Sequence, residues 1–382
     1  MEIIEEPIRV AQIIGKWLGG GVESVVMNYY RHIDKEKIQF DFICDEDSTN
    51  IPYEEIEKLG GKVILIPPYQ KVVKYHKELK KVLKEGKYKI VHSHINTLSV
   101  FSLFAAKCAG VPVRIAHSHS TTNKKEKKKN LIKQVLRPFS KVFATNYMCC
   151  SEHAGRWLFG DKEYDKGNVY LLNNAIDLDK YKYNEDVRLK TRKKLNICND
   201  EIVFGHVGRF VQTKNQKFVL EVFNKFHKKN KKSKLIYVGQ GPDLESVKFL
   251  TQKYHLTESV VFMGQCSNIF EIYQAMDVFL FPSLYEGLGM VLIEAQASNL
   301  PCVVSNNVPI EVKINDNVYF ENINAGCQIW LNTIENIIKY LNNRTSIVKL
   351  LSEKGYNIEI EAKKLQKKYF ELIELGGNNE KN

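Results

Sequence analysis

Short apolar runs rich in β-branched residues alternate along the chain with segments of helical spacing. The runs of the first half lie at residues 9–14, 40–45, 62–66, 90–94 and 113–119. A second series lies at residues 202–208, 234–239, 260–264, 278–283 and 301–305. Because strands separated by helices indicate βαβ units, each series predicts a parallel sheet of the α/β class.

The length of the chain favours two domains. A single hydrophobic core usually stops growing well below its 382 residues. A polar segment rich in Asn, Asp and Lys, around residues 172–197, separates the two strand series and suits a junction. Residues 356–375 have the spacing of an amphipathic helix, which we expect to return to the first domain. We therefore predict one α/β domain at 1–180, a second at 181–355, and a C-terminal helix within 356–382 that packs on the first.

Composition narrows the class of protein. With 44% hydrophobic and 26% charged residues, the chain is typical of a folded protein. Its eight cysteines form no C-x-x-C motif and no zinc-ligand spacing with histidine, which favours reduced thiols in the cytosol. The start lacks a secretory pattern, and no run approaches the ~20 apolar residues of a membrane span. We expect a cytoplasmic protein whose membrane contact, if any, is peripheral.

Positive charge is concentrated in one part of the chain. Residues 51–150 contain 20 Lys and Arg against 6 Asp and Glu, while the whole chain has a net charge of +12. Such a block attracts a polyanion, which leaves nucleic acid, an anionic membrane and a diphosphate-bearing acceptor open. Within it, five lysines precede apolar residues at helical spacing: Lys124, Lys125, Lys127, Lys128 and Lys129. This pattern indicates either an interfacial membrane contact or a solvated loop ahead of a core-facing helix.

The most informative stretch runs from Pro282 to Ala295 and contains two carboxylates, Glu286 and Glu294, with seven residues between them. A glycine-flanked loop after a buried strand lets backbone N–H groups approach an anion, and the following helix directs its positive end there. We expect phosphate contacts at four successive residues, Gly287, Leu288, Gly289 and Met290. Both carboxylates could then reach one elongated ligand, although two solvated glutamates would give the same spacing.

This stretch resembles the E-x7-E signature of family 4 retaining glycosyltransferases, and the resemblance covers nearly the whole chain. It implies the GT-B architecture of two Rossmann-like domains and a nucleotide-sugar donor, here a UDP-sugar. The resemblance further implies that Glu286 contacts the donor sugar and that Glu294 binds the ribose. Similar bacterial enzymes build capsules and exopolysaccharides on glycan or lipid-linked acceptors, and the family generally needs no bound metal or other cofactor.

Other segments match the family in order. Arg209 and Lys214 resemble its pyrophosphate-binding pair, which would stabilise charge on the leaving nucleoside diphosphate. The loop containing Gly20 and Gly21 resembles the family's glycine-rich donor-phosphate loop. Three further residues resemble positions beside the nucleotide: Gly239, Gly241 and Gln265. Neither glycine-rich turn fits the G-x-G-x-x-G fingerprint of dinucleotide-binding enzymes.

Histidines mark the ends of two expected strands, as His92 and His94 and then His117 and His119. By the resemblance, one histidine after the second of these strands reaches the donor sugar. The sequence leaves His117 and His119 open, although His119 is closer to the loop. Four histidines also suggest a metal, but no nearby carboxylate or cysteine completes a ligand set, so we expect none.

The sequence thus predicts a retaining glycosyltransferase in which Glu286, Arg209, Lys214 and His119 or His117 act in catalysis. Leaving-group departure and acceptor attack on the same face of the sugar would give retention. Three other functions stay open: a nucleotide-sugar epimerase of the same fold, a noncatalytic nucleotide-sugar-binding protein and a nucleic-acid-binding protein. No recognised nucleic-acid-binding motif accompanies the lysines, so we expect no nucleic-acid partner.

Overall fold

The computed structural model describes residues 6–119, 127–266, 268–341 and 344–378. The chain divides into two compact units. The first comprises residues 1–176 together with 357–382, and the second comprises residues 177–356. The last segment of the chain therefore belongs to the N-terminal unit.

The N-terminal unit is built on a seven-stranded sheet with the order β3-β2-β1-β4-β5-β6-β7, in which neighbouring strands are parallel. Its strands are β1 Ile8–Gly15, β2 Ile38–Asp45, β3 Lys62–Ile66, β4 Ile90–Ser93, β5 Val113–Ser118, β6 Asn146–Cys149 and β7 Val169–Leu171. Its helices are α1 Gly21–His32, α2 Tyr53–Lys58, α3 Val72–Glu85, α4 Ser99–Cys108, α5 Lys127–Leu136, α6 Glu152–Phe159, α7 Asp161–Asp165 and α16 Ile358–Asn378.

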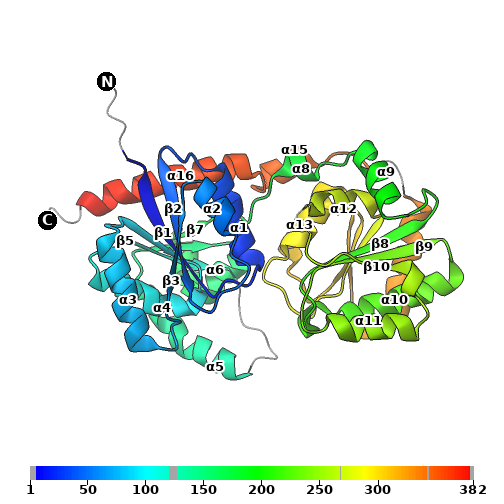
Figure 1. Cartoon of the computed structure of the whole chain (residues 1–382), viewed down its shortest axis with the longest axis horizontal. Coiled ribbons are helices and arrows are strands. Elements are labelled where there is room, and N and C mark those ends of the chain that lie inside the picture. Colours follow the sequence, from blue (N-terminus) through cyan, green and yellow to red (C-terminus); the bar gives the residue numbers. More distant parts are fainter. Residues whose placement is uncertain (1–5, 120–126, 267, 342–343, 379–382) are drawn as a thin grey trace. The chain divides into compact units, whose positions relative to one another are not determined.

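Helices cover both faces of this sheet. On one face, buried side chains of α3, α4 and α6 form a core with β1, β4 and β5 that includes Leu79, Leu103 and Leu158. On the other face α16, the red helix of Figure 1, packs against α1 and β5. Tyr369 of α16 is fully buried there. The amphipathic tail helix predicted from the sequence is thus confirmed.

The C-terminal unit has a six-stranded parallel sheet with the order β10-β9-β8-β11-β12-β13. Its strands are β8 Ile202–Val207, β9 Ser233–Val238, β10 Val260–Phe262, β11 Val278–Phe281, β12 Cys302–Ser305 and β13 Val318–Glu321. Its helices are α8 Leu178–Tyr181, α9 Glu185–Lys194, α10 Gln216–Lys229, α11 Leu244–Lys253, α12 Ile269–Ala275, α13 Met290–Ala297, α14 Cys327–Lys339 and α15 Val348–Glu353. Figure 1 shows α10 and α11 on one side of these strands and α12 and α13 on the other.

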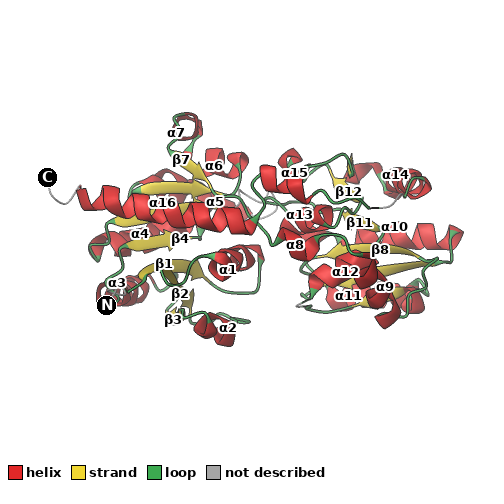
Figure 2. Cartoon of the chain, turned by 90° about the horizontal axis from the view of Figure 1, so that it is seen from above, coloured by secondary structure: helices red, strands yellow, loops and turns green. Residues whose placement is uncertain are grey.

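Two Rossmann-like domains, with strands and helices interleaved, confirm the predicted fold class (Figure 2). Each of the ten predicted strand runs forms a strand. The sequence pattern does not reveal β6, β7 and β13, which have only three or four residues each. Length alone does not distinguish them from the predicted strands, because β10 also has three residues and β4, β11 and β12 have four each.

None of the described helices combines the length and the apolar character that a membrane span requires.

Candidate active site

Strands β8 and β11 are parallel neighbours in the C-terminal sheet, so their carboxyl ends lie side by side. The strand order reverses between these two strands. Ligands of open α/β sheets bind outside the carboxyl ends of the strands at such a switch point. The loop after β8 contains Arg209 and Lys214, and the loop after β11 contains Glu286. Three predicted site residues therefore follow the two strands that border this point.

An ion pair joins the two loops. The Nζ of Lys214 donates to Oε1 of Glu286 at 2.5 Å, and the exposed fractions of the two side chains are 22% and 9%. A backbone hydrogen bond of 2.7 Å from Leu284 to Thr213 fixes the loops beside this pair. The structure thus brings together two residues that are 72 positions apart. Arg209 lies exposed on the first loop, and no described carboxylate forms an ion pair with its guanidinium.

The loop after β9 packs directly on the loop after β8. A Cβ atom on Gly239 would lie 2.1 Å from the carbonyl oxygen of Gly208, and one on Gly241 would lie 2.3 Å from that of Phe210. Both glycines have positive φ, 132° and 155°. Only glycine fits these two positions, because a side chain would separate the loops. Their observed role is the contact between the two loops.

The helix α13 begins beside the ion pair. Its N-cap, Gly289, has a φ of 81°, in the left-handed region. The ring of Phe281 lies near both features: a Cβ on Gly289 would be 3.4 Å from it, and the Lys214 Nζ is 5.2 Å from its centroid. Leu288, in the loop before this helix, is buried. The first N–H groups of a helix have no partner within the helix, so the N-terminus of α13 beside a lysine is an arrangement that suits a phosphate.

Glu294 lies in the second turn of α13, where Tyr273 of α12 donates a hydrogen bond of 2.9 Å to its Oε2. Burial raises the pKa of Glu294 to about 7, although hydrogen bonds from Tyr273 and Tyr181 oppose this shift. A carboxyl group held partly buried at a fixed position can accept hydrogen bonds from ligand hydroxyls. Sequence reasoning missed Tyr273, because nothing in the local pattern of α12 links it to a residue 21 positions away.

Comparison with known proteins assigns the family. Residues 19–180 match the family described as Glycosyltransferase Family 4, and residues 187–357 match Glycosyl transferases group 1. A protein of Bacillus subtilis (strain 168) named as the glycosyltransferase EpsF is 35% identical, over 80% of this chain and 80% of its own length. The chain belongs to glycosyltransferase family 4.

Two further proteins are similar over almost the whole chain. One is UDP-Gal:alpha-D-GlcNAc-diphosphoundecaprenol alpha-1,3-galactosyltransferase of Escherichia coli, which is 26% identical over 98% of this chain and 99% of its own. The other is HepE of Anabaena, solved in complex with UDP, which superposes with a TM-score of 0.76 at 16% identity. That superposition covers 95% of this chain and 100% of HepE, and it shows the shared fold.

In the N-terminal unit of this family 4 protein, the predicted glycine-rich loop lies between β1 and α1. Gly20 caps α1 and Gly21 is its first residue. Glu23 turns back to accept the backbone N–H of Leu18 at 2.9 Å, and a Cβ on Gly20 would lie 3.0 Å from this carboxylate. Gly21 faces open space, since a Cβ atom at this position would have no described atom within 4 Å. The loop is thus a tight, carboxylate-closed turn whose open side lies at Gly21.

All four strand-end histidines form one buried cluster at the carboxyl ends of β4 and β5. His92 and His117 are 1% exposed, His94 is 5% and His119 is 6% exposed. His92 Nε2 lies 3.0 Å from His117 Nδ1, and His94 Nδ1 lies 2.9 Å from His119 Nε2. Burial lowers the pKa of His92 and of His119 to about 3, so both are neutral near pH 7.

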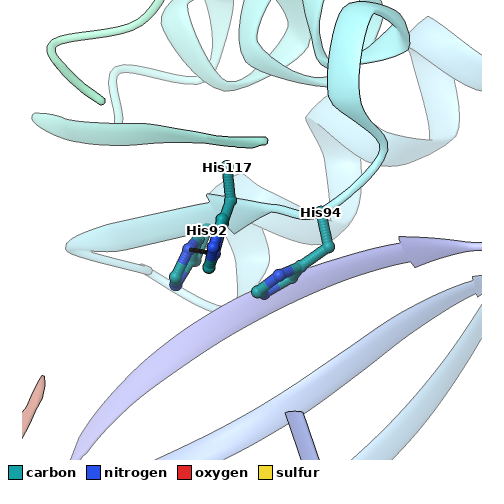
Figure 3. A group of neighbouring side chains, drawn as sticks. All are labelled: His92, His94 and His117. Carbon is teal, nitrogen blue, oxygen red and sulfur yellow. Dashed lines mark hydrogen bonds between the residues drawn. The ribbon is translucent and has the colours of Figure 1, made fainter. Parts of the chain in front are cut away.

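One atom each of His92, His94 and His117 lie within 4.8 Å of one another, which raises the question of a metal site (Figure 3). Hydrogen bonds already use both nitrogens of His92 and of His94. Among the described residues, no carboxylate or thiol joins the group. A dication there would break these bonds without meeting an opposite charge, which disfavours a metal.

All five predicted membrane-contact lysines fall where the structure does not describe side chains. Lys124 and Lys125 lie outside the described residues, and Lys127, Lys128 and Lys129 form the first turn of α5. Four of the apolar side chains that follow are exposed, Leu131 64%, Val135 59%, Phe139 51% and Val142 56%, while Leu136 is partly buried. Of the two interpretations of this segment, the exposure disfavours the core-facing helix.

A pH dependence of stability follows from the environment of Glu294. Its pKa of about 7 in the folded protein exceeds the ~4.3 of an unfolded chain, so the unfolded chain ionises first as pH rises. The free energy of unfolding therefore falls as pH rises from ~4.3 through about 7. Glu294→Gln keeps a neutral side chain at every pH. We expect the variant to gain stability relative to the wild type between pH 5 and pH 8, by about 1–3 kcal/mol.

Urea unfolding of both proteins at the two pH values measures this difference. Glu245→Gln is the control, because that carboxylate side chain is 81% exposed. An equal difference at pH 5 and pH 8 would show that Glu294 does not titrate in this range.

Proposed function

We propose that this protein is a retaining glycosyltransferase that transfers a sugar from a UDP-sugar to a glycan or lipid-linked acceptor in the assembly of a surface polysaccharide. The observation that carries the proposal is the Lys214–Glu286 pair at the switch point between β8 and β11, beside the first turn of α13. A cation, a carboxylate and a helix N-terminus there suit a ligand that contains both phosphate and sugar hydroxyls.

We expect each residue to bind a different part of the nucleotide-sugar donor. Arg209, Lys214 and the α13 N-terminus would bind the diphosphate and stabilise the charge that develops as it leaves. Glu286 would accept hydrogen bonds from sugar hydroxyls, and Glu294 would accept them from the ribose. Because cations and backbone N–H groups meet the diphosphate charge, the proposed reaction needs no bound metal.

Retention follows from a same-face reaction. Leaving-group departure and acceptor attack would occur on one face of the sugar, and the departing phosphate would take the acceptor proton. In a retaining glycosidase two carboxyl groups lie ~5 Å apart around one bond. Here Glu286 is paired with Lys214, while Glu294 is bonded to Tyr273, so the two carboxylates have separate partners.

The relatives support the choice of substrates. The name of the Escherichia coli enzyme specifies a UDP-sugar donor and an acceptor linked to diphosphoundecaprenol, and HepE was solved with UDP. The resemblance to capsular and exopolysaccharide enzymes favours the same cellular role. We propose that the protein works in the cytoplasm, at the inner face of the membrane.

A donor panel tests the proposal. Each nucleotide-sugar is incubated with lipid-linked and soluble acceptors while release of nucleoside diphosphate is measured, and NMR of the product gives its anomeric configuration. We expect acceptor-dependent release of UDP and an unchanged anomer. An inverted product would refute retention. Conversion of a UDP-sugar to another sugar in water alone would indicate an epimerase, and donor binding without any release would indicate a noncatalytic protein.

The exposed apolar side of α5 extends the proposal to the membrane. Lysines at the start of a helix, followed by exposed Leu131, Val135 and Phe139, are typical of an interfacial segment that binds anionic lipid. Each lysine near an anionic surface contributes roughly 1 kcal/mol. We therefore expect reversible, salt-sensitive binding to anionic vesicles and none to neutral vesicles.

Charge reversal separates this segment from the general surplus of positive charge. Replacing Lys127, Lys128 and Lys129 by Glu should reduce cosedimentation with anionic vesicles at least tenfold while transfer to a soluble acceptor continues. The matched control reverses three exposed lysines of α3: Lys74, Lys77 and Lys81. An equal loss in both variants would assign the binding to net charge, and no binding by the wild type at low salt would refute the membrane contact.

A further inference from the structure

The side chain of Gln12 lies between two chains of hydrogen bonds inside the N-terminal unit. Gln12 is in β1, opposite His92 of β4 in the sheet register, and is 1% exposed. Its Oε1 lies 2.8 Å from His94 Nε2, and its Nε2 donates to the hydroxyl of Tyr369 at 3.2 Å. An amide offers one acceptor and one donor, so the two chains start from Gln12 with opposite polarity.

The first chain runs through His94 to His119. Gln12 Oε1 can only accept, so His94 holds a proton on Nε2 and its Nδ1 is an acceptor. His119 then donates from Nε2 to His94 Nδ1, across 2.9 Å. In a neutral His119 this leaves an unprotonated Nδ1, and that nitrogen has no hydrogen-bond partner among the described residues.

The second chain runs through Tyr369 and His92 to His117. The Tyr369 hydroxyl accepts from Gln12 and donates to His92 Nδ1 at 2.7 Å. His92 therefore holds its proton on Nε2 and donates to His117 Nδ1 at 3.0 Å. His117 is left with a proton on Nε2, an atom that is buried and likewise has no described partner.

Neutrality of all four rings is required for this assignment. Burial lowers the pKa of each imidazole, to about 3 for His92 and His119 and well below the usual 6.5 for His94 and His117. A neutral imidazole has one protonated nitrogen and one acceptor nitrogen. Within each chain, every ring therefore donates from one nitrogen and accepts at the other, so all its hydrogen bonds run in the same direction.

We propose that Gln12 and Tyr369 are positioning residues that give all four histidines the same tautomer and thereby leave a free acceptor on His119 and a free donor on His117. The rings of His117 and His119 are stacked with centroids 3.9 Å apart, so the two free nitrogens belong to adjacent rings. The family resemblance assigns a donor-sugar contact to one of these two histidines, and a sugar hydroxyl can both donate and accept through one atom. Both free nitrogens are buried in this structure. If the side-chain amide of Gln12 is rotated so that Oε1 and Nε2 exchange places, every hydrogen bond in both chains reverses its direction of donation. One free nitrogen is then still a donor and the other still an acceptor.

The identity of the hydroxyl rests on the proposed function, but the tautomers do not. The first test is therefore spectroscopic: ¹⁵N-labelled histidines are examined by long-range ¹H–¹⁵N correlation NMR, with signals assigned by single histidine substitutions. We expect protons on Nε2 of all four rings: His92, His94, His117 and His119. The turned-over amide would place all four on Nδ1. A mixture of the two tautomers among these rings in the wild type would overturn the inference.

Two variants test the positioning residues. Tyr369→Phe removes the hydroxyl that donates to His92, so we expect tautomer exchange in His92 and His117 while His94 and His119 keep their protons on Nε2. Gln12→Met removes donor and acceptor, and both pairs should exchange. Tyr30→Phe is the matched control, because its hydroxyl is buried in the same unit and bonds Gln39 at 2.6 Å. Spectra of Gln12→Met identical to those of the wild type would overturn the proposal.

Kinetics give the functional readout. We expect Gln12→Met to lower kcat/KM for the donor about tenfold, the value of one hydrogen bond, with UDP affinity unchanged. Unchanged kcat/KM in a variant with altered tautomers would refute the contact with the sugar, whereas absence of transfer by the wild type would refute the proposed function alone.

Metal analysis gives a further test of the network. One firmly bound zinc per chain, lost on His92→Leu, would show that the nitrogens bind metal and would overturn the network.

Discussion

Turnover in Arg209→Ala and in Lys214→Ala should fall by roughly 10²- to 10³-fold, while the dissociation constant for the UDP-sugar changes by less than about tenfold. Charge on the departing diphosphate grows toward the transition state, so groups that meet this charge affect the rate more than ground-state binding. Single-turnover kinetics and calorimetry with intact donor measure the two effects separately.

Lys217→Ala is the control, because Lys217 is an exposed lysine only three residues beyond Lys214. Removal of Lys214 also leaves Glu286, 9% exposed, without its cation, so its effect should exceed that of Arg209. An equal loss in donor binding and in turnover would contradict the leaving-group role. Both residues would then be assigned to uniform substrate binding.

Glu294→Ala should weaken UDP binding by about 10- to 10²-fold. Hydrogen bonds to a charged group contribute ~1.5–3 kcal/mol each, and every 1.4 kcal/mol is a factor of ten in affinity. Calorimetry at pH 8, where the carboxyl group with its pKa of about 7 is ionised, measures the effect. Tyr273→Phe should cause a smaller loss, since it removes the hydroxyl that donates to Glu294 but leaves the carboxylate.

To test the ribose contact, the affinities of the wild type and of Glu294→Ala are measured for UDP and for inorganic diphosphate. A ribose contact predicts that Glu294→Ala weakens only the nucleotide. If both ligands lost affinity equally in a folded variant, Glu294 would act through the shape of α13, and its assignment to the ribose would be wrong.

The fold was predictable because apolar runs and helical spacing are local signals. The ten predicted strand runs and the tail helix follow from spacing within about a dozen residues. The three residues of β7, Val169–Leu171, are not recognised in the sequence, because the parallel pairing with β6 that defines the strand is not a local signal. The charged loops were found through the motif, but the pairing of Lys214 with Glu286 needed the parallel order of β8 and β11.

The supporting residues could not be found from the sequence. Gln12 and Tyr369 are 357 positions apart, and neither lies in a pattern that distinguishes it from a core residue. Gly239 and Gly241 are predicted to lie beside a nucleotide, and the structure adds that they allow two loops to pack together. Local patterns identify residues that contact a ligand more readily than the residues that hold them, because support acts through the folded chain.

The position of α16 has a consequence for synthesis on the ribosome. The N-terminal unit receives residues 357–382 only after the whole of residues 177–356 has been translated. At ~5–20 residues per second, that interval lasts roughly 10–40 s. During this time Gln12 and His92 lack Tyr369, and the face of the sheet that α16 covers stays open to solvent. The C-terminal unit, which is continuous in the chain, can therefore complete its core before the unit that is made first.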